Sequence, residues 1–368
     1  MKCTEVLLVA ASLVASVNAH ILKQFHRKEA SVLEVTLSPA TTGGVAELIA
    51  TVTNVGPTDL NLLKIGTLLD ESLPVQKVLA VDELGNEAKF KGIHASIRYD
   101  ALKAEHFHTL RASESVSTNI SAASIHDFAK SGTYTFTASG LMPVAATGST
   151  KLSGPALSFQ SNNVSLYVGA EAAAAVPKIL SFNPLEARTR VQDGCNATQL
   201  AASTAALEHC VTLALAAAAD AKDPSSTRFI EYFKTNSSET RQIVADRLTA
   251  VSKECSTTNS GISLYYCYDT YSLCEIDGPL NAYTKWDVDA VVMCPIFYDT
   301  LPPLPQACHH QDQATTTIHE MTHCEDVYSP HTNDYTYGYN ESTAQTPERA
   351  LLNADNYSLF ANAVYMKC

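Results

Sequence analysis

Residues 20–194 contain no cysteine, although the chain of 368 residues has ten. This absence excludes disulfides from that stretch. The nine cysteines after Cys3 all lie between Cys195 and Cys368, and this change in composition indicates a domain boundary near residue 190. In an exported protein, clustered cysteines indicate disulfides rather than thiolate metal ligands. Because nine is odd, at least one thiol stays free or pairs outside the chain.

Basic residues are scarce in the second half of the chain. Residues 191–368 contain 9 Lys and Arg against 22 Asp and Glu, whereas residues 1–190 contain 16 of each kind. The whole net charge of −13 therefore belongs to the second half. Such a surface repels nucleic acid, which we exclude as a partner, and attracts cationic peptides. Solubility in an acidic medium explains the same charge equally well.

Long apolar runs are also missing. A short one from Val6 to Ala15 follows Lys2 and leads to a small residue at Ala19. This pattern is typical of a secretory signal peptide cleaved after about Ala19. No later run reaches the roughly 18 apolar residues that a membrane span needs. We therefore expect residues 1–19 to be removed from a soluble, secreted protein that has no membrane partner.

Residues 31–170 predict strands. Runs of β-branched residues at 31–37, 46–53, 132–137 and 163–168 are separated by glycine, proline and asparagine. This spacing favours an antiparallel β-sandwich-like fold. No catalytic constellation occurs in this half, where the neighbouring histidines are interpreted as surface residues rather than a metal site. These are His106 and His108.

The chain then changes from strands to helices. An alanine-rich joint begins at Ala170, and Arg188 and Arg190 offer basic residues to a processing protease. We therefore expect residues 20–190 to be a propeptide that is removed on activation. Helical periodicity in residues 191–368 predicts a mainly α domain large enough for a core of its own. The expected helices are 198–219, 238–254, 311–325 and 347–366.

The third of these helices contains the sequence His319-Glu320-Met321-Thr322-His323. Spacing of i and i+4 puts both imidazoles on one helical face, a turn apart, where they can bind one ion. Glu320 between them could activate a water on that ion and pass its proton to a leaving amine. The alternative is a pair of solvent-exposed histidines on a polar helix. The motif predicts a zinc-dependent hydrolase.

A catalytic zinc ion needs a third protein ligand and an open fourth position. The metzincin pattern is excluded, because Ser329 replaces its third histidine and Asp326 its glycine. Two carboxylates remain. Glu341 follows an asparagine, as in gluzincins, at a shorter spacing than usual, and Asp334 lies eleven residues after His323. The spacing alone leaves both open.

The segment around Asp334 resembles the signature of the deuterolysin family, the aspzincins, in which HExxH precedes Gly-Thr-x-Asp-x-x-Tyr-Gly. This chain matches at Thr332, Asp334, Tyr337 and Gly338, and departs at His331, which stands where the family has glycine. The resemblance extends over nearly the whole chain. It includes residues 229–234, 301–304, 311–315 and 353–355, and in the first half residues 53–60.

The resemblance implies a zincin catalytic domain with one Zn²⁺. Its ligands would be His319, His323 and Asp334, with Glu320 as general base and Tyr337 stabilising the oxyanion. His309, His310 and His331 would then lie near the site or on the surface without being ligands. The family also implies Cys195–Cys267, Cys274–Cys294 and Cys308–Cys368. To these we add Cys210–Cys255, expected if the first two helices pack antiparallel, which leaves Cys324 as an inert buried thiol or a thiol near the metal.

The expected protein is a secreted, monomeric zinc metalloendopeptidase. Its substrates would be proteins or peptides, with a preference for basic ones, and its own propeptide would act as an intramolecular inhibitor. Two alternatives remain open: a gluzincin that uses Glu341 as third ligand, and a secreted binding or effector protein with a structural zinc ion and no turnover. Six Asn-X-Ser/Thr sequons could carry glycans. They begin at Asn119, Asn163, Asn196, Asn236, Asn340 and Asn356.

Overall fold

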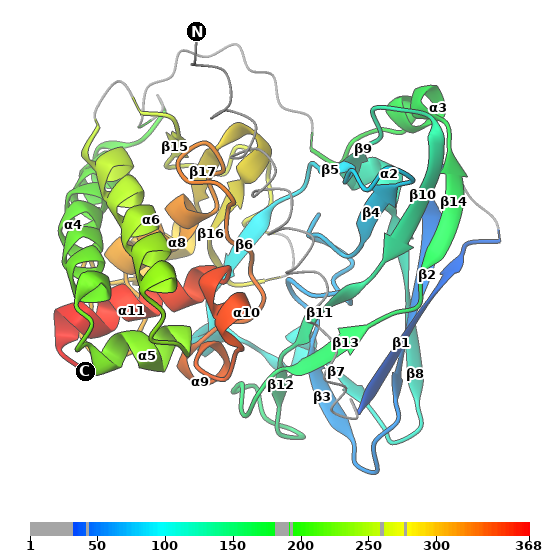
Figure 1. The fold of residues 1–368 in the computed structure, drawn as a ribbon, viewed down its shortest axis with the longest axis horizontal. Helices are drawn as coiled ribbons and strands as arrows, with labels where there is room; N and C mark the ends of the chain where they lie inside the picture. The colour runs from blue at the N-terminus through cyan, green and yellow to red at the C-terminus, as the bar shows by residue number, and fades with distance from the viewer. Residues whose placement is uncertain (1–31, 42–43, 181–190, 192–193, 258–260, 276–277) are drawn as a thin grey trace, which may run out of the picture.

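The computed structural model describes residues 32–41, 44–180, 191, 194–257, 261–275 and 278–368. The expected signal peptide and the basic processing segment at 188–190 lie outside the described residues, so both stay predictions. Figure 1 shows a unit built of strands beside a unit dominated by helices, with the C-terminus in the helical unit. Strand β6 (His94–Ile97) belongs to the first half of the chain but lies against β16 (Leu280–Lys285) of the second (Figure 1).

The first unit consists of short antiparallel strands. In β1 (Leu33–Pro39) and β2 (Glu47–Asn54) every second residue is buried, as expected for strands with one face on a core. Leu48, Ala50 and Val52 lie in that core and are fully buried. The antiparallel β character is thus present, while the sandwich arrangement stays a prediction. The expectation that His106 lies on the surface is wrong. The residue is buried, and its Nδ1 accepts a 2.9 Å hydrogen bond from the Lys103 backbone.

The elements of this unit fall into five small sheets and a few single turns of helix. The sheets are β1 (Leu33–Pro39), β2 (Glu47–Asn54) and β8 (Ser115–Ser121); β14 (Val164–Val168), β10 (Gly132–Thr137) and β4 (Leu79–Asp82); β12 (Val144–Ala145), β3 (Leu60–Leu63) and β7 (Phe107–Leu110); β11 (Ser139–Met142) and β13 (Leu157–Gln160); and β5 (Lys89–Phe90) and β9 (His126–Asp127). The helical turns are η1 (Tyr99–Ala101), η2 (Ala104–His106), α2 (Ala122–Ile125) and α3 (Ala170–Ala175).

The second unit packs helices around one core and adds a small sheet of order β15-β17-β16-β6. The sheet was not expected from the sequence. Its strands β15 (Leu264–Tyr266), β16 (Leu280–Lys285) and β17 (Ala290–Met293) are fully buried, so they show no alternation of polar and apolar residues. The helices are α4 (Ala197–Lys222), α5 (Thr227–Phe233), α6 (Ser238–Ser256), α7 (Pro295–Thr300), α8 (Gln313–Thr322), α9 (Tyr339–Ser342), α10 (Pro347–Leu351) and α11 (Ala354–Met366), with η3 at Trp286–Val288.

Two expected helices are shorter or divided. The helix with the histidine motif begins only at Gln313, because the Asp312 side chain caps it by accepting a 2.9 Å hydrogen bond from the Thr315 backbone. The expected helix 347–366 is interrupted at Asn353. The Oδ1 atom of Asn353 accepts hydrogen bonds from the backbones of Tyr335 and Thr336, so this residue holds another loop instead of continuing the helix.

Helix α4 is long and apolar enough to cross a membrane, which corrects the expectation that no later segment would be. The same helix begins with a capping box, in which Asn196 and Gln199 exchange hydrogen bonds. It packs against α6, α8 and α11, and its buried alanines and leucines belong to the core of the helical unit. Packing inside the protein thus accounts for the buried part of this helix, which is 39% of its most apolar window.

Four disulfides cross-link the second unit. They are Cys195–Cys267, Cys210–Cys255, Cys274–Cys294 and Cys308–Cys368, the pairs named from the sequence, and Cys324 is free and buried. Among the sequons, Asn356 is fully buried, and Nδ2 donates to the carbonyls of Tyr232 and Ser342. A glycan on Asn356 is therefore excluded in this fold. The other five asparagines are exposed.

A third core joins the two units. Ile93, Ala95 and Ile97, in and beside β6, lie in one cluster with Leu280 and Tyr283 of β16. The two strands pair antiparallel from Leu280↔Ile97 to Thr284↔His94. Strand β6 is thus an edge strand of the second unit's sheet, although residues from the first unit supply it.

Candidate metal centre

Helix α8 places two histidines at the centre of the site. His319 and His323 are one turn apart, and their ring centroids are separated by 5.0 Å. Both side chains are buried, as is every residue of α8. Because a helix fixed on all sides cannot rotate, the two imidazoles keep one orientation.

The third group comes from the loop after α8. Oδ1 of Asp334 lies 3.0 Å from Nε2 of His319 and 3.2 Å from Nε2 of His323. The loop is held against the helix by Thr332, whose carbonyl oxygen lies 2.9 Å from Nδ1 of His323. Gly338 ends the loop with a φ of 80°, in the left-handed region that favours glycine.

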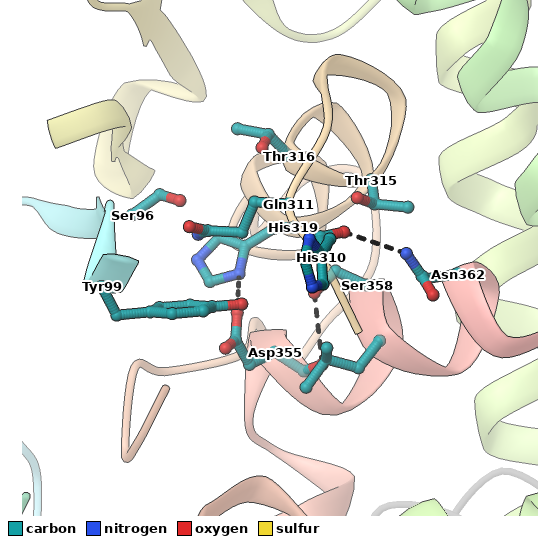
Figure 2. A pocket seen from close by; sticks show the side chains of 11 residues that line it. Ser96, Tyr99, His310, Gln311, Thr315, Thr316, His319, Asp355, Ser358 and Asn362 are labelled. Carbon is teal, nitrogen blue, oxygen red and sulfur yellow. Dashed lines mark hydrogen bonds and ion pairs between the residues drawn. The ribbon is translucent and has the colours of Figure 1, made fainter. Parts of the chain in front are cut away.

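Each histidine is oriented through its second ring nitrogen. Nδ1 of His319 lies 2.9 Å from Oδ1 of Asp355, an interaction drawn as a dashed line in Figure 2, and Nδ1 of His323 faces the Thr332 carbonyl. Such contacts fix the tautomer and turn Nε2 toward a metal. The second oxygen of Asp355 accepts a 2.6 Å hydrogen bond from the Gly338 backbone. No role was predicted for Asp355, which is the second residue of α11.

Buried polar atoms converge at this point without hydrogen-bond partners among the described residues. They include Nε2 of His319, Nε2 of His323, Oδ1 of Asp334 and Oε1 of Glu320. Asp334 Oδ1 lies at ion-pair distance from the two Nε2 atoms, but a buried polar atom that makes no hydrogen bond still costs about 1–3 kcal/mol. Two imidazole nitrogens and a carboxylate oxygen are ligands that zinc takes in catalytic sites. The residues present therefore fit a divalent metal ion.

Charges in the site are strongly coupled. Burial alone would raise the pKa of the Asp334 carboxyl, but the two histidines hold that pKa far below its usual range. Burial likewise opposes protonation of His319, yet Asp334 and Asp355 raise the pKa of this imidazole well above its ordinary value. The site thus keeps a buried carboxylate against two nitrogens, an arrangement that a cation would neutralise.

Glu320 lies on the same helix with one oxygen anchored. Its Oε2 accepts a 2.6 Å hydrogen bond from the Thr284 hydroxyl of β16, and its Oε1 is unpaired among the described residues. Burial raises the pKa of Glu320 to about 8. A carboxylate with a pKa near neutrality can accept a proton and release it again, as a general base and acid requires.

The remaining candidates separate by their surroundings. Tyr337 is buried, and its hydroxyl donates a 2.8 Å hydrogen bond to the Ala95 carbonyl of β6. Glu341 is buried on α9, and burial raises the pKa of its carboxyl to about 7. The contacts described for Glu341 do not include either histidine of the motif. Asp334 is therefore the carboxylate that geometry joins to them.

The other three histidines considered from the sequence contact residues outside the proposed ligand set. His331 stacks on Trp286 at 4.4 Å, and its Nδ1 lies 2.7 Å from Glu325. Its backbone is not among those with positive φ in the described chain, so this position does not need the family glycine. His309 stacks on Tyr339 at 3.7 Å. His310 lines a small pocket beside His319 (Figure 2).

Cys324 is buried next to His323, with Sγ 3.9 Å from the Glu320 carbonyl. Burial raises the pKa of this thiol well above its usual value. A thiol with a high pKa is a poor nucleophile and a poor metal ligand. Of the two interpretations of Cys324, the geometry favours the inert one.

The site also contains a histidine that was not predicted from the sequence. His94, on β6, stacks on His323 with ring centroids 4.5 Å apart. His94, His323 and Asp334 each offer a ligand atom, and these atoms all lie within 4.8 Å of one another. No local pattern marks His94, because its neighbours in the site are more than two hundred residues away in the sequence.

The comparisons with known proteins agree with the motif. The model of the deuterolysin metalloprotease (M35) family matches residues 1–368. A neutral protease 2 homolog of Botryotinia fuckeliana is 46% identical over 368 residues, which is 100% of both chains. One of Sclerotinia sclerotiorum is 46% identical over 342 residues, 93% of this chain and 92% of its own. Penicillolysin of Penicillium citrinum is 39% identical over 338 residues, 92% of this chain and 93% of its own. The chain therefore belongs to the deuterolysin family and is a metalloendopeptidase.

Proposed function

We propose that the chain is the precursor of a secreted zinc metalloendopeptidase whose metal ligands are His319, His323 and Asp334. The observation that carries this proposal is the convergence of three buried ligand atoms, with Asp334 Oδ1 within 3.2 Å of both Nε2 atoms and no hydrogen bond from any of the three to another described group. Zinc takes two imidazoles and a carboxylate in catalytic sites that keep a position open. Glu341 is then left without a ligand role.

The bound ion would act as a Lewis acid that polarises the scissile carbonyl and makes a nearby water more acidic. Glu320 supplies the general base: its free Oε1 accepts a proton from the attacking water, while Thr284 holds Oε2 in place. The same carboxyl, with its pKa raised by burial, then returns the proton to the leaving amine. Tyr337 would donate to the developing oxyanion through its hydroxyl, which already donates to a carbonyl.

The precursor, export and substrate class are part of the same proposal. We propose that residues 1–19 are a signal peptide and residues 20–190 an inhibitory propeptide. The four disulfides support export, because disulfides form in oxidising compartments, and all four lie in the second unit, which would remain after cleavage. The net charge of −13 in residues 191–368 supports a preference for basic protein substrates by electrostatic attraction. We also propose that the released domain is a monomer.

The experiment is hydrolysis of a basic protein by the processed enzyme, first with a chelator and then with zinc restored. We expect activity to disappear with the chelator and return with zinc. Glu320→Gln should bind zinc equally well and lose nearly all turnover. Zinc binding without turnover in the processed parent would support a binding protein instead. Full activity of Glu320→Gln would overturn the assigned mechanism.

A further inference from the structure

Strand β6 is bound to the second unit as a peptide would be. Its backbone pairs antiparallel with β16 at the edge of a sheet, with Tyr283 opposite Ala95 and Thr284 opposite His94. Addition of an extended segment to a sheet edge is a common way to bind a peptide. Thr284 is also the residue that holds Glu320. The strand therefore runs directly past the proposed catalytic carboxylate.

Both polar backbone groups of Ala95 contact the site. Its N–H donates a 3.0 Å hydrogen bond to Oδ2 of Asp334, and its carbonyl accepts the 2.8 Å hydrogen bond from Tyr337. Asp334 uses its other oxygen toward the two histidines. One residue of the first half of the chain thus lies between a proposed ligand and the proposed oxyanion donor.

The imidazole of His94 stacks on that of His323, and a ring nitrogen lies within 4.8 Å of the ligand atoms that His323 and Asp334 offer. The residue is 6% exposed, and its ring is almost parallel to that of His323, with an interplanar angle of 14°. Its Nε2 is buried and has no hydrogen-bond partner among the described residues, as is also true of Nε2 in His319 and His323. A buried, unpaired imidazole nitrogen is costly, and nearby carbon side chains do not compensate for it. A metal ion bound jointly by His94, His323 and Asp334 would compensate for the missing hydrogen bond.

We propose that His94 is a fourth protein ligand of the metal in the uncleaved chain. This inference rests on the proposed metal site and adds a ligand to it. With His94 bound, the position that a catalytic zinc keeps for water is closed, and β6 fills the edge where a substrate strand would pair. Removal of the first unit would take away the ligand and the strand together. The precursor would then be kept inactive in two separable ways: His94 fills the metal's open position, and β6 blocks the sheet edge where a substrate would bind.

Strand β6 is held by enough other contacts to survive the loss of His94. The Arg98 backbone donates a 2.6 Å hydrogen bond to Pro279, and Gln311 donates one of 3.0 Å to the Ile97 carbonyl. Ile93 and Ile97 are nearly or fully buried in the core shared with β16. A substitution at His94 should therefore leave the strand in place, so its effect on the metal can be measured in a folded protein.

The test uses the full-length chain with Glu320→Gln, so that the protein does not process itself. X-ray absorption at the zinc edge should give three imidazole ligands in this chain and two after the first unit has been cleaved off. His94→Phe, which keeps a flat ring for stacking, should give two imidazoles before cleavage and release zinc to a chelator at least ~10-fold faster. His331→Phe is the matched control, because its ring centroid lies 5.3 Å from that of His94 and Nδ1 is already bound to Glu325.

Two further variants separate the possible failures. Asp334→Ala in the same chain tests the proposed site, and retention of full zinc affinity there would count against that site rather than against His94. His94→Gln provides a smaller side chain, and thermal unfolding checks that each variant is folded. If His94→Phe and His94→Gln both keep three imidazoles and the parent's rate of zinc release, His94 is not a ligand and the inference is wrong.

Discussion

The hydroxyl of Thr284 on β16 donates a 2.6 Å hydrogen bond to Oε2 of Glu320 on α8. Both residues are fully buried, so water does not replace this bond when it is lost. The contact leaves Oε1 as the free oxygen of the carboxylate. Thr284 therefore positions the proposed general base without touching a substrate itself.

Thr284→Val removes the hydroxyl while nearly keeping the shape of the side chain. We expect kcat to fall by about 10-fold or more, because a misplaced general base loses most of its contribution. KM and zinc content should change little. Thr317→Val is the matched control, since within the described residues that buried hydroxyl bonds only to a carbonyl of its own helix, at Gln313. Equal kinetics for Thr284→Val and the parent enzyme would argue against a positioning role.

Asp355→Asn tests how the metal site is oriented. The substitution keeps an oxygen that can accept from the Gly338 backbone but removes the negative charge facing Nδ1 of His319. Loss of such an outer contact typically lowers metal affinity by about 10–100-fold. The measurement is zinc affinity by competition with a chromophoric chelator. Ser358→Ala, on the same helix, should keep the parent affinity, and an unchanged affinity in Asp355→Asn would contradict the assignment.

Asp289 gives the stability of the fold a pH dependence. Burial and the neighbouring Asp326 raise the pKa of Asp289 to about 7, from an ordinary value of 3.8. The folded state therefore holds a proton that the unfolded state has already lost between these two values. The stabilisation is complete below 3.8 and is lost as the pH rises through about 7, with a slope of about 1.4 kcal/mol per pH unit.

Asp289→Asn should remove that slope and make the protein more stable than the parent above pH 7. Asparagine tolerates the left-handed conformation that this residue adopts, with a φ of 51°. The free energy of unfolding is to be measured by denaturant titration at several pH values in parent and variant. Because other groups titrate in the same window, the difference between the two proteins is the relevant quantity. Parallel pH profiles would contradict the role of Asp289.

The disulfide Cys210–Cys255 joins α4 to α6 and closes a loop with a sequence separation of 45. Replacing both cysteines by serine should lower the free energy of unfolding by about 2–4 kcal/mol, because the unfolded chain regains entropy. The denaturation midpoint measures this loss. Cys324→Ser is the comparison: it removes no cross-link, so the midpoint should fall much less. Similar shifts in the two variants would mean that the cross-link adds nothing beyond packing.

The sequence predicted what is local and missed what is distant. The two histidines and Glu320 lie within one helical turn, so spacing alone was sufficient to join them. Thr284 and Asp355 each lie 36 positions from their partner in the motif, and Ala95 lies 239 positions from Asp334. No periodicity connects such positions. The buried strands of the second unit were missed for a related reason, since their continuous burial removes the alternation that marks a strand.

The third ligand is the choice that spacing left open, and two variants decide it. Asp334→Ala removes the oxygen that lies 3.0 and 3.2 Å from the two Nε2 atoms, so zinc content and activity should both be lost. Glu341→Ala removes a buried carboxyl on α9, and zinc content should stay near one per chain. Because burial raises the pKa of Glu341 to about 7, this carboxyl is partly neutral, and its removal should change the charge around the metal site little.

Metal analysis after dialysis compares the zinc content of the two variants, and circular dichroism checks that both are folded. Zinc retained in Asp334→Ala but lost in Glu341→Ala would assign the ion to the gluzincin arrangement, and the contact between Asp334 and the histidines would then be an ion pair without a metal.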